Sequence, residues 1–226
     1  MTGRGTVHDT ALLDVDGTLV DTNYQHALAW FRAFRRVGVT RPVWRIHRAV
    51  GMGGDQLVGA VAGEEVEREH GDTLRDLWAE EIEKLLPEVQ PFEGAAELLL
   101  ELRRRGWRVV LASSGQESHV ERFLDLLGAR DLVQARTSSD DADATKPAPD
   151  LLRAALERVD GKGGVVLGDA TWDCLAAQNA GMPSVAVRTG GFSVEELRDA
   201  GAAHVADSLP ELLRDLDDTP LRAPTP

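Results

Sequence analysis

The chain has 226 residues, of which 42% are hydrophobic and 28% charged, a composition typical of a globular protein with one large domain or a core carrying a smaller insertion. Its formal net charge of −13 argues against nucleic acid and anionic membrane surfaces as partners, because both attract clustered lysine and arginine. Cys174 is the only cysteine, so an intrachain disulfide is excluded and we expect a small buried side chain. No apolar segment has signal-peptide or transmembrane length, so we expect a cytoplasmic protein.

The first predicted element ends in two closely spaced aspartates. Ala11-Leu12-Leu13 is a short apolar run of the kind that forms a buried strand of a parallel sheet, and Asp14 follows it directly. Asp16 lies two residues after Asp14 and directly before a glycine that lets the chain turn. Ligands of open α/β sheets bind beyond the carboxyl ends of the strands. The pattern therefore predicts paired carboxylates that could hold a metal ion, attack phosphorus or transfer protons.

Residues 22–89 show helical patterns and no convincing strand. Apolar residues recur at helical spacing from Ala27 to Phe34, and Gly38 marks the end of that helix. A second clear helix is predicted from Asp72 to Leu86. This segment is far longer than the ~30 residues that a complete βαβ unit needs. We therefore interpret it as a helical insertion between the first two strands of a sheet.

The rest of the chain alternates helix and strand. An Ala/Leu-rich helix ends in three arginines and Gly106, and strands are predicted at 109–112, 165–167 and 184–187. Two late capping patterns, Ser193 with Glu196 and Ser208 with Glu211, predict terminal helices. The fold class expected is α/β, a doubly wound parallel sheet with an inserted all-helical domain. We assign the core to residues 1–21 and 90–216, the insertion to 22–89, and a disordered tail to 217–226.

Further polar residues stand at strand ends or helix starts: Ser113 and Ser114, Lys146, and Asp169 with Asp173. The two serines end the second predicted strand, the lysine precedes a proline-marked helix start, and the aspartates follow the third strand. Because the carboxyl ends of parallel strands meet at one edge of a sheet, we expect all of them near Asp14 and Asp16.

In this order the residues resemble the haloacid dehalogenase superfamily, whose members are mostly phosphohydrolases. The four motifs are DVDGT at Asp14, LASS at Ser113, KPAPD at Lys146 and GDATWD at Asp169. Any one of them alone is a weak signal, but the four in order cover residues 11 to about 190. Thr145 departs from the pattern, since many relatives have glycine before the lysine. The branch with an all-helical cap, which includes phosphoglycolate phosphatases and β-phosphoglucomutases, is the most similar, and its cap closes over the active site.

The resemblance implies catalytic roles for the motif residues. Asp14 would be the nucleophile that forms an aspartyl-phosphate, and Asp16 would protonate the leaving oxygen and then deprotonate the attacking water. Lys146 would neutralise the nucleophile and the phosphoryl charge. Ser113 and the backbone N–H of Ser114 would bind phosphoryl oxygens.

The resemblance also implies a metal site. Asp14, the backbone carbonyl of Asp16, and Asp169 would be its ligands, while Asp173 would hold a metal-bound water or orient Lys146. Oxygen ligands suit a hard cation, so Mg²⁺ is expected rather than Zn²⁺.

Two residues of the insertion are candidates for contact with the substrate. Arg48 precedes the glycine-rich loop Gly51 to Asp55, which could reach into the cleft. His26 lies near the start of the first helix of the insertion, where related phosphatases and mutases also have a histidine.

The function expected is hydrolysis of a small phosphorylated metabolite, phosphoglycolate-like or sugar-phosphate-like, by a phosphoric monoester hydrolase. A β-phosphoglucomutase-like phosphomutase would use the same four motifs and is the main alternative. A dehalogenase is disfavoured because those relatives lack the second acid, here Asp16. A non-enzymatic binding protein of this fold would be expected to have lost one of the motif residues, and none is lost.

Overall fold

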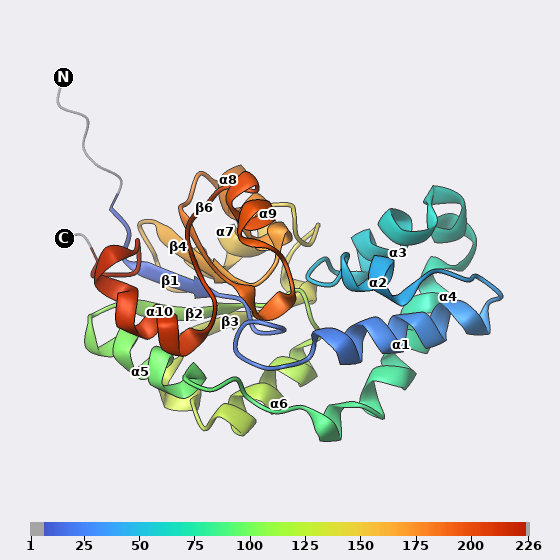
Figure 1. Cartoon of the computed structure of the whole chain (residues 1–226), viewed down its shortest axis with the longest axis horizontal. Helices are drawn as coiled ribbons and strands as arrows, with labels where there is room; N and C mark the ends of the chain where they lie inside the picture. The colour runs from blue at the N-terminus through green and yellow to red at the C-terminus, as the bar shows by residue number, and fades with distance from the viewer. Residues whose placement is uncertain (1–6, 225–226) are drawn as a thin grey trace.

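In the computed structural model, which describes residues 7–224, a six-stranded parallel sheet lies between two layers of helices (Figure 1). The strand order β3-β2-β1-β4-β5-β6 places the first strand near the middle, so the expected doubly wound topology is confirmed. The strands are β1 (Thr10–Leu13), β2 (Arg108–Ala112), β3 (Ala135–Thr137), β4 (Gly164–Gly168), β5 (Ser184–Val187) and β6 (Ala202–Ala206).

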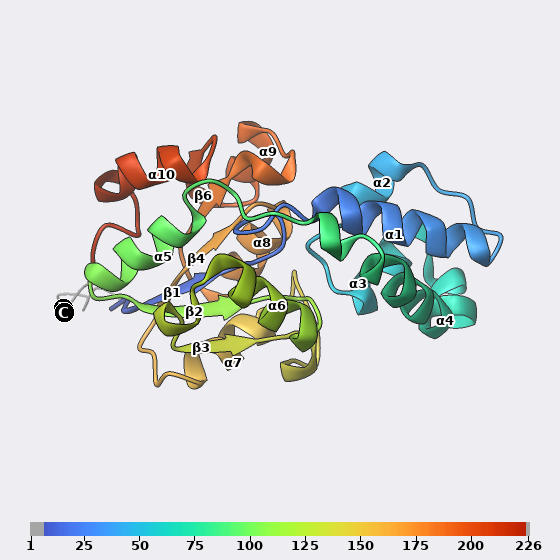
Figure 2. The ribbon, with the colours of Figure 1, turned by 90° about the horizontal axis from the view of Figure 1, so that it is seen from below.

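The helices between and after these strands cover both faces of the sheet (Figure 2). The α-helices of this part are α5 (Ala95–Arg104), α6 (Glu117–Leu127), α7 (Asp150–Glu157), α8 (Thr171–Ala180), α9 (Val194–Asp199) and α10 (Leu209–Asp215). Short 3-10 turns are η2 (Arg130–Leu132), η3 (Ser139–Asp141), η4 (Arg188–Gly190) and η5 (Leu216–Asp218). The late helices α9 and α10 begin where the capping patterns predicted them: Ser193 accepts from the Glu196 N–H and Ser208 from the Glu211 N–H.

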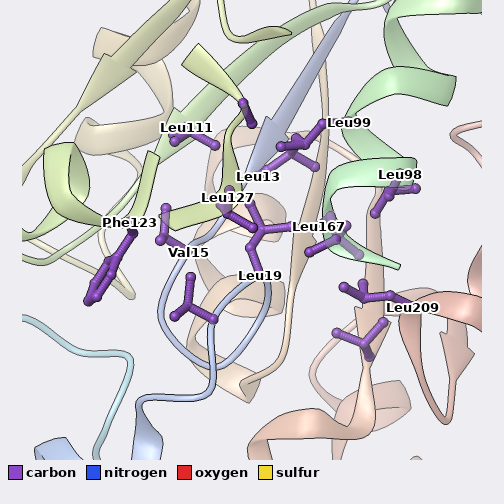
Figure 3. Packing of buried hydrophobic residues seen from close by; sticks show 14 of the residues in the cluster. Leu13, Val15, Leu19, Leu98, Leu99, Leu111, Phe123, Leu127, Leu167 and Leu209 are labelled. Carbon is purple, nitrogen blue, oxygen red and sulfur yellow. The ribbon is translucent and has the colours of Figure 1, made fainter. Parts of the chain in front are cut away.

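Alternate side chains of the central strands pack into different layers. Leu13 and Leu111 belong to a hydrophobic cluster with side chains of α5, α6 and α10 (Figure 3). Leu12 and Val110 point to the other face, where they cluster with side chains of α7 and α8. Burial on both faces explains why these strands read as continuous apolar runs rather than as alternating ones.

The residues inserted between β1 and β2 form a helical cap beside the sheet (Figure 1). Its helices are α1 (Asn23–Arg36), α2 (Val43–His47), α3 (Gly54–Ala62), α4 (Glu64–Glu83) and the 3-10 turn η1 (Leu86–Glu88). The cap has a hydrophobic cluster of its own, built from buried residues between Ala27 and Leu74. Helix α4 begins before the predicted Asp72 because three glutamates occupy its first turn, where they favour the helix N-terminus.

The structure contains two strands that the sequence pattern did not indicate. They are β3 and β6, which lie at the two edges of the sheet. Edge strands are only partly covered, and both carry polar side chains, Arg136 and His204, so neither shows a buried apolar run. Among residues 7–224, no helix is both long enough and apolar enough to cross a membrane.

Residues 217–224, expected to be disordered, instead pack against the core. The side chain of Leu221 is fully buried, and the Trp107 indole N–H donates to the Leu221 carbonyl at 3.1 Å. Arg105 also donates to the Arg222 carbonyl at 2.7 Å. The polar, proline-rich composition of this segment gave no indication of these contacts. Residues 225–226 of the expected tail lie outside the described part of the chain.

We expect Trp107→Phe to destabilise the protein by about 1–2 kcal/mol, because the buried Leu221 carbonyl loses its donor while most of the ring packing remains. Urea unfolding measures the change. Trp44→Phe is the control, since Trp44 is 68% exposed. Equal stability of the two variants would show that this anchor contributes nothing.

Candidate active site

Three carboxylates and one lysine meet at the carboxyl ends of the central strands. Asp14 directly follows β1 and Asp169 directly follows β4, its neighbour in the sheet. Lys146, which is fully buried, forms ion pairs with Asp14 and, at 2.7 Å, with Asp173 on the first turn of α8. One oxygen from each of the three aspartates lies within 4.8 Å of the others. The expected convergence of the first, third and fourth motifs is therefore present.

Burial and mutual repulsion govern the charges of this cluster. Burial raises the pKa of Asp14 well above its usual range, with repulsion from the neighbouring aspartates adding to the effect and Lys146 opposing it. Burial and the charge of Asp173 raise the pKa of Asp169 to about 7. Burial alone would lower the pKa of Lys146, but Asp14 and Asp173 raise it above its ordinary value. The lysine is therefore charged, and the carboxylates exceed it in number.

This imbalance fits a divalent cation. The donor set is entirely carboxylate oxygen, which matches a hard ion such as Mg²⁺. A second positive group beside Asp14 and Asp169 would relieve the repulsion that raises their pKa values. The residues present thus suit the metal that the motifs imply.

Contacts from the loop after β1 fix the position of Asp169. Thr18 Oγ1 donates to Asp169 Oδ1 at 2.9 Å, and Asn23 Nδ2 donates to Oδ2 at 2.8 Å. Gly17, which follows the two aspartates of the first motif, has φ +79° and no room for a Cβ beside Asn23 and Asp169. The sequence analysis proposed no role for Thr18 or Asn23. Thr18 is the last residue of the motif DVDGT, so its place near the site could have been proposed from that motif.

Asp16 lies on the same loop and is bonded on both oxygens. Thr22 Oγ1 donates to its Oδ1 at 2.8 Å, and His26 Nε2 lies 2.9 Å from the same oxygen. Ser113 Oγ donates to its Oδ2 at 3.3 Å. Although burial acts to raise it, the charge and hydrogen bond of His26 and the bond from Thr22 hold the pKa of Asp16 at about 2. In this arrangement Asp16 is an ionised carboxylate whose orientation is set by two residues at the start of α1 and by Ser113 after β2.

A cavity of about 330 Å³ opens between the cap and the carboxyl edge of the sheet. Asp14 and Asp16 line its floor, and Ser114 and Gly115 line it after β2. The cap contributes Trp30 and Trp78, which stack on each other at 5.4 Å between ring centroids, together with the loop 50–55 and Arg75. The cavity can therefore hold a small molecule with its reacting end at the aspartates and the remainder against the cap.

The remaining candidates take different positions. The side-chain oxygen of Ser114 is buried without a hydrogen-bond partner, whereas Ser113 is engaged with Asp16 and the Gly115 N–H. His26 lines the cavity and bonds Asp16. Arg48 does not line the cavity: its guanidinium pairs with Glu196 and lies 3.8 Å from the Phe192 ring centroid. The end of α2 directs this arginine onto the core near α9, which the sequence spacing alone did not indicate.

Cys174, on α8, matches its expectation as a small buried side chain. It is 1% exposed, and burial raises the pKa of its thiol to about 12. At neutral pH the group is a protonated thiol and does not contribute a nucleophile.

Comparisons with known proteins agree with this geometry. The family model described as haloacid dehalogenase-like hydrolase matches residues 8–181. A phosphoglycolate phosphatase of Caulobacter vibrioides is 30% identical, with 90% of each chain covered. A validoxylamine A 7'-phosphate phosphatase of Streptomyces hygroscopicus subsp. limoneus is 27% identical over 93% of this chain and 95% of that protein. The crystal structure of a hydrolase from Pseudomonas syringae has a TM-score of 0.86 at 31% identity, covering 92% of this chain and 98% of the other.

We expect Mg²⁺ to stabilise the protein through the aspartate cluster. At a concentration 100 times its dissociation constant, the ion should add about 2.7 kcal/mol, or roughly 5–10 °C in the thermal midpoint. Asp169→Asn should abolish most of this rise, yet be at least as stable as the parent without metal, because one repelling charge is gone. Thermal unfolding with EDTA or MgCl₂ measures both effects.

The matched control is Glu97→Gln, which removes one exposed acid on α5 far from the cluster and should keep the full response to Mg²⁺. An unchanged Mg²⁺ response in Asp169→Asn would remove this residue from the metal site.

Proposed function

Because this chain belongs to the haloacid dehalogenase-like hydrolases, we propose that it is a Mg²⁺-dependent phosphatase that hydrolyses a small phosphorylated metabolite through an aspartyl-phosphate on Asp14. The observation that carries the proposal is the pairing of two different carboxylates on one cavity floor. Asp14 is buried and paired with Lys146, whereas Asp16 is ionised and bonded to His26. Two aspartates in such unlike surroundings suit two separate tasks.

In the first step an Asp14 oxygen attacks the phosphorus of the substrate. A new O–P bond forms as the bond to the leaving oxygen breaks. Asp16, ionised in the free site, takes up the proton of the incoming phosphate monoanion and passes it to that leaving oxygen. Lys146 remains charged next to Asp14 and stabilises the negative charge on the phosphoryl group. The backbone N–H of Ser114, at the turn between β2 and α6, is suited to bind a phosphoryl oxygen.

In the second step water hydrolyses the aspartyl-phosphate. Asp16, now ionised, accepts the proton of the attacking water, and Asp14 is regenerated as phosphate leaves. Thr22, His26 and Ser113 hold the Asp16 carboxylate in place for both proton transfers. Mg²⁺, held by Asp14, the Asp16 carbonyl and Asp169 near Asp173, would supply positive charge that neutralises the phosphoryl oxygens.

The cap is proposed to choose the substrate. The part of the cavity away from Asp14 is lined by Trp30, Trp78, Arg75 and the loop 50–55, all from the insertion. Its size suits a metabolite of the phosphoglycolate or sugar-phosphate kind, and the two relatives named above are a phosphoglycolate phosphatase and a validoxylamine A 7'-phosphate phosphatase. The net charge of −13 supports a free metabolite rather than nucleic acid or a membrane as the partner, and we propose that the enzyme works in the cytoplasm.

We expect the protein to release phosphate from 4-nitrophenyl phosphate in the presence of MgCl₂. EDTA should stop turnover and added Mg²⁺ should restore it, because the aspartate cluster needs the cation. Continuous release over many turnovers would distinguish hydrolysis from transfer to a second sugar. Undiminished activity in EDTA would be incompatible with the metal assignment.

Asp14→Asn should abolish turnover, because an amide is not a nucleophile that can form the intermediate. Asp16→Asn should lower kcat by about 10²–10⁴-fold through loss of proton transfer. Steady-state kinetics on 4-nitrophenyl phosphate measure both. Asp21→Asn changes an exposed aspartate of the same loop outside the cavity and should retain the parent rate. A largely active Asp14→Asn enzyme would rule out the covalent mechanism.

A further inference from the structure

The cap loop and the loop that carries Lys146 are joined by one hydrogen-bonded pair. Thr145 Oγ1 donates to Asp55 Oδ1, and the Thr145 N–H donates to Asp55 Oδ2 at 3.2 Å. The Gly53 N–H donates back to Thr145 Oγ1 at 3.0 Å. Thr145 is 4% exposed, and a Cβ on Gly53 would overlap its side chain, so the cap loop approaches as closely as glycine allows. The two loops are thus in direct contact, not separated by solvent.

The contact between Thr145 and Asp55 lies directly beside Lys146, a residue of the aspartate cluster. Thr145 directly precedes Lys146, whose ammonium pairs with Asp14 and Asp173. In the described part of the chain, the hydrogen bonds of the Thr145 hydroxyl go to cap residues alone. Asp55 and Thr145 also line the cavity, so the pair stands at the wall that the substrate meets.

A second cap–core contact lies elsewhere and serves as a comparison. Arg48 pairs with Glu196 and covers Phe192, while the Trp172 indole N–H donates to the Arg48 carbonyl at 3.0 Å. The Arg48 side chain is outside the cavity and contacts the core through Phe192 and Glu196. It therefore holds the cap to the core without touching the loop of the lysine.

We propose that Asp55 and Thr145 are positioning residues that tie the placement of Lys146 to the docking of the cap loop. With the loop docked, Asp55 fixes the backbone and side chain of Thr145, and the adjacent Lys146 is held at the distance from Asp14 that phosphoryl binding requires. Without the Asp55–Thr145 pair, the loop that carries Lys146 loses its hydrogen bonds to the cap loop. The proposal rests on the proposed function of Lys146. It adds that the position of the Lys146 ammonium depends on whether the cap loop is docked.

The test uses two generic probes, an activated aryl phosphate and orthovanadate, in place of the natural substrate. Thr145→Val keeps the shape of the side chain but removes the hydroxyl, and it should lower kcat/KM for 4-nitrophenyl phosphate about tenfold. The inhibition constant of orthovanadate, a phosphoryl mimic, should rise by a similar factor, since its binding reports the position of Lys146 without turnover. Thr145→Ser restores the hydroxyl and should recover most of both losses.

Variants of cap residues distinguish a change in the position of Lys146 from a general disturbance of the core around Thr145. Asp55→Ala changes an exposed side chain and should reproduce the losses of Thr145→Val, and the double variant should be no worse than either single one. Arg48→Ala loosens the other cap contact and should leave vanadate inhibition close to that of the parent. Thermal unfolding of each variant checks that the fold is intact.

The outcomes are distinct. Parent-like kinetics and vanadate inhibition in Thr145→Val would overturn the proposal while leaving the phosphatase assignment in place. Losses in Arg48→Ala equal to those in Thr145→Val would also overturn it, because cap docking in general would then be responsible. A parent protein with neither phosphate release nor vanadate binding would overturn the proposed function, and this proposal with it.

Discussion

The active site depends on an excess of buried negative charge around one lysine. Asp14, Asp169 and Asp173 converge at the ends of β1 and β4. Among the described side chains only Lys146 forms ion pairs with this cluster, through Asp14 and Asp173. Such a cluster is unfavourable until more positive charge arrives, as the raised pKa values of Asp14 and Asp169 indicate. The carboxylates of Asp169 and Asp173 are held by hydrogen bonds from Thr18, Asn23 and the Ala170 N–H. The unfavourable charge of the cluster is consistent with the cation that we propose for this edge of the sheet.

The start of the cap is part of this electrostatic arrangement. Thr22 and His26 bond Asp16, and Asn23 bonds Asp169, so the first turn of α1 contacts two carboxylates of the core. The cap therefore meets the catalytic residues at its hinge as well as through the loop above the cavity. A single helix links the hinge to the aromatic wall, since Trp30 lies one turn beyond His26 on the same helix. The orientation of the Asp16 carboxylate and the shape of the cavity therefore both depend on α1.

The sequence was sufficient where the signal is local and insufficient where it depends on distant partners. The strands beside the site were predictable because burial on both faces gives β1, β2 and β4 uninterrupted apolar runs, and each run ends in its motif residue. The edge strands β3 and β6 lack such runs and were not found. Asn23, which lies outside the motifs, donates to Asp169 from more than a hundred residues away, a relation that no short pattern contains. The place of Arg48 against Phe192 follows from the direction of α2, which composition does not encode.

The position of the insertion also bears on how the protein assembles. The residues of the cap cluster all lie in one stretch of the chain, from Ala27 to Leu74. The strands that pair with β1, which are β2 and β4, both come much later in the sequence. Contacts between residues close in sequence form sooner, and a chain emerging from the ribosome offers its N-terminal part first. The helical cap can thus collapse around its own apolar centre before the sheet exists. We therefore expect the aspartate cluster, which joins residues 14, 146 and 169, to form after the cap.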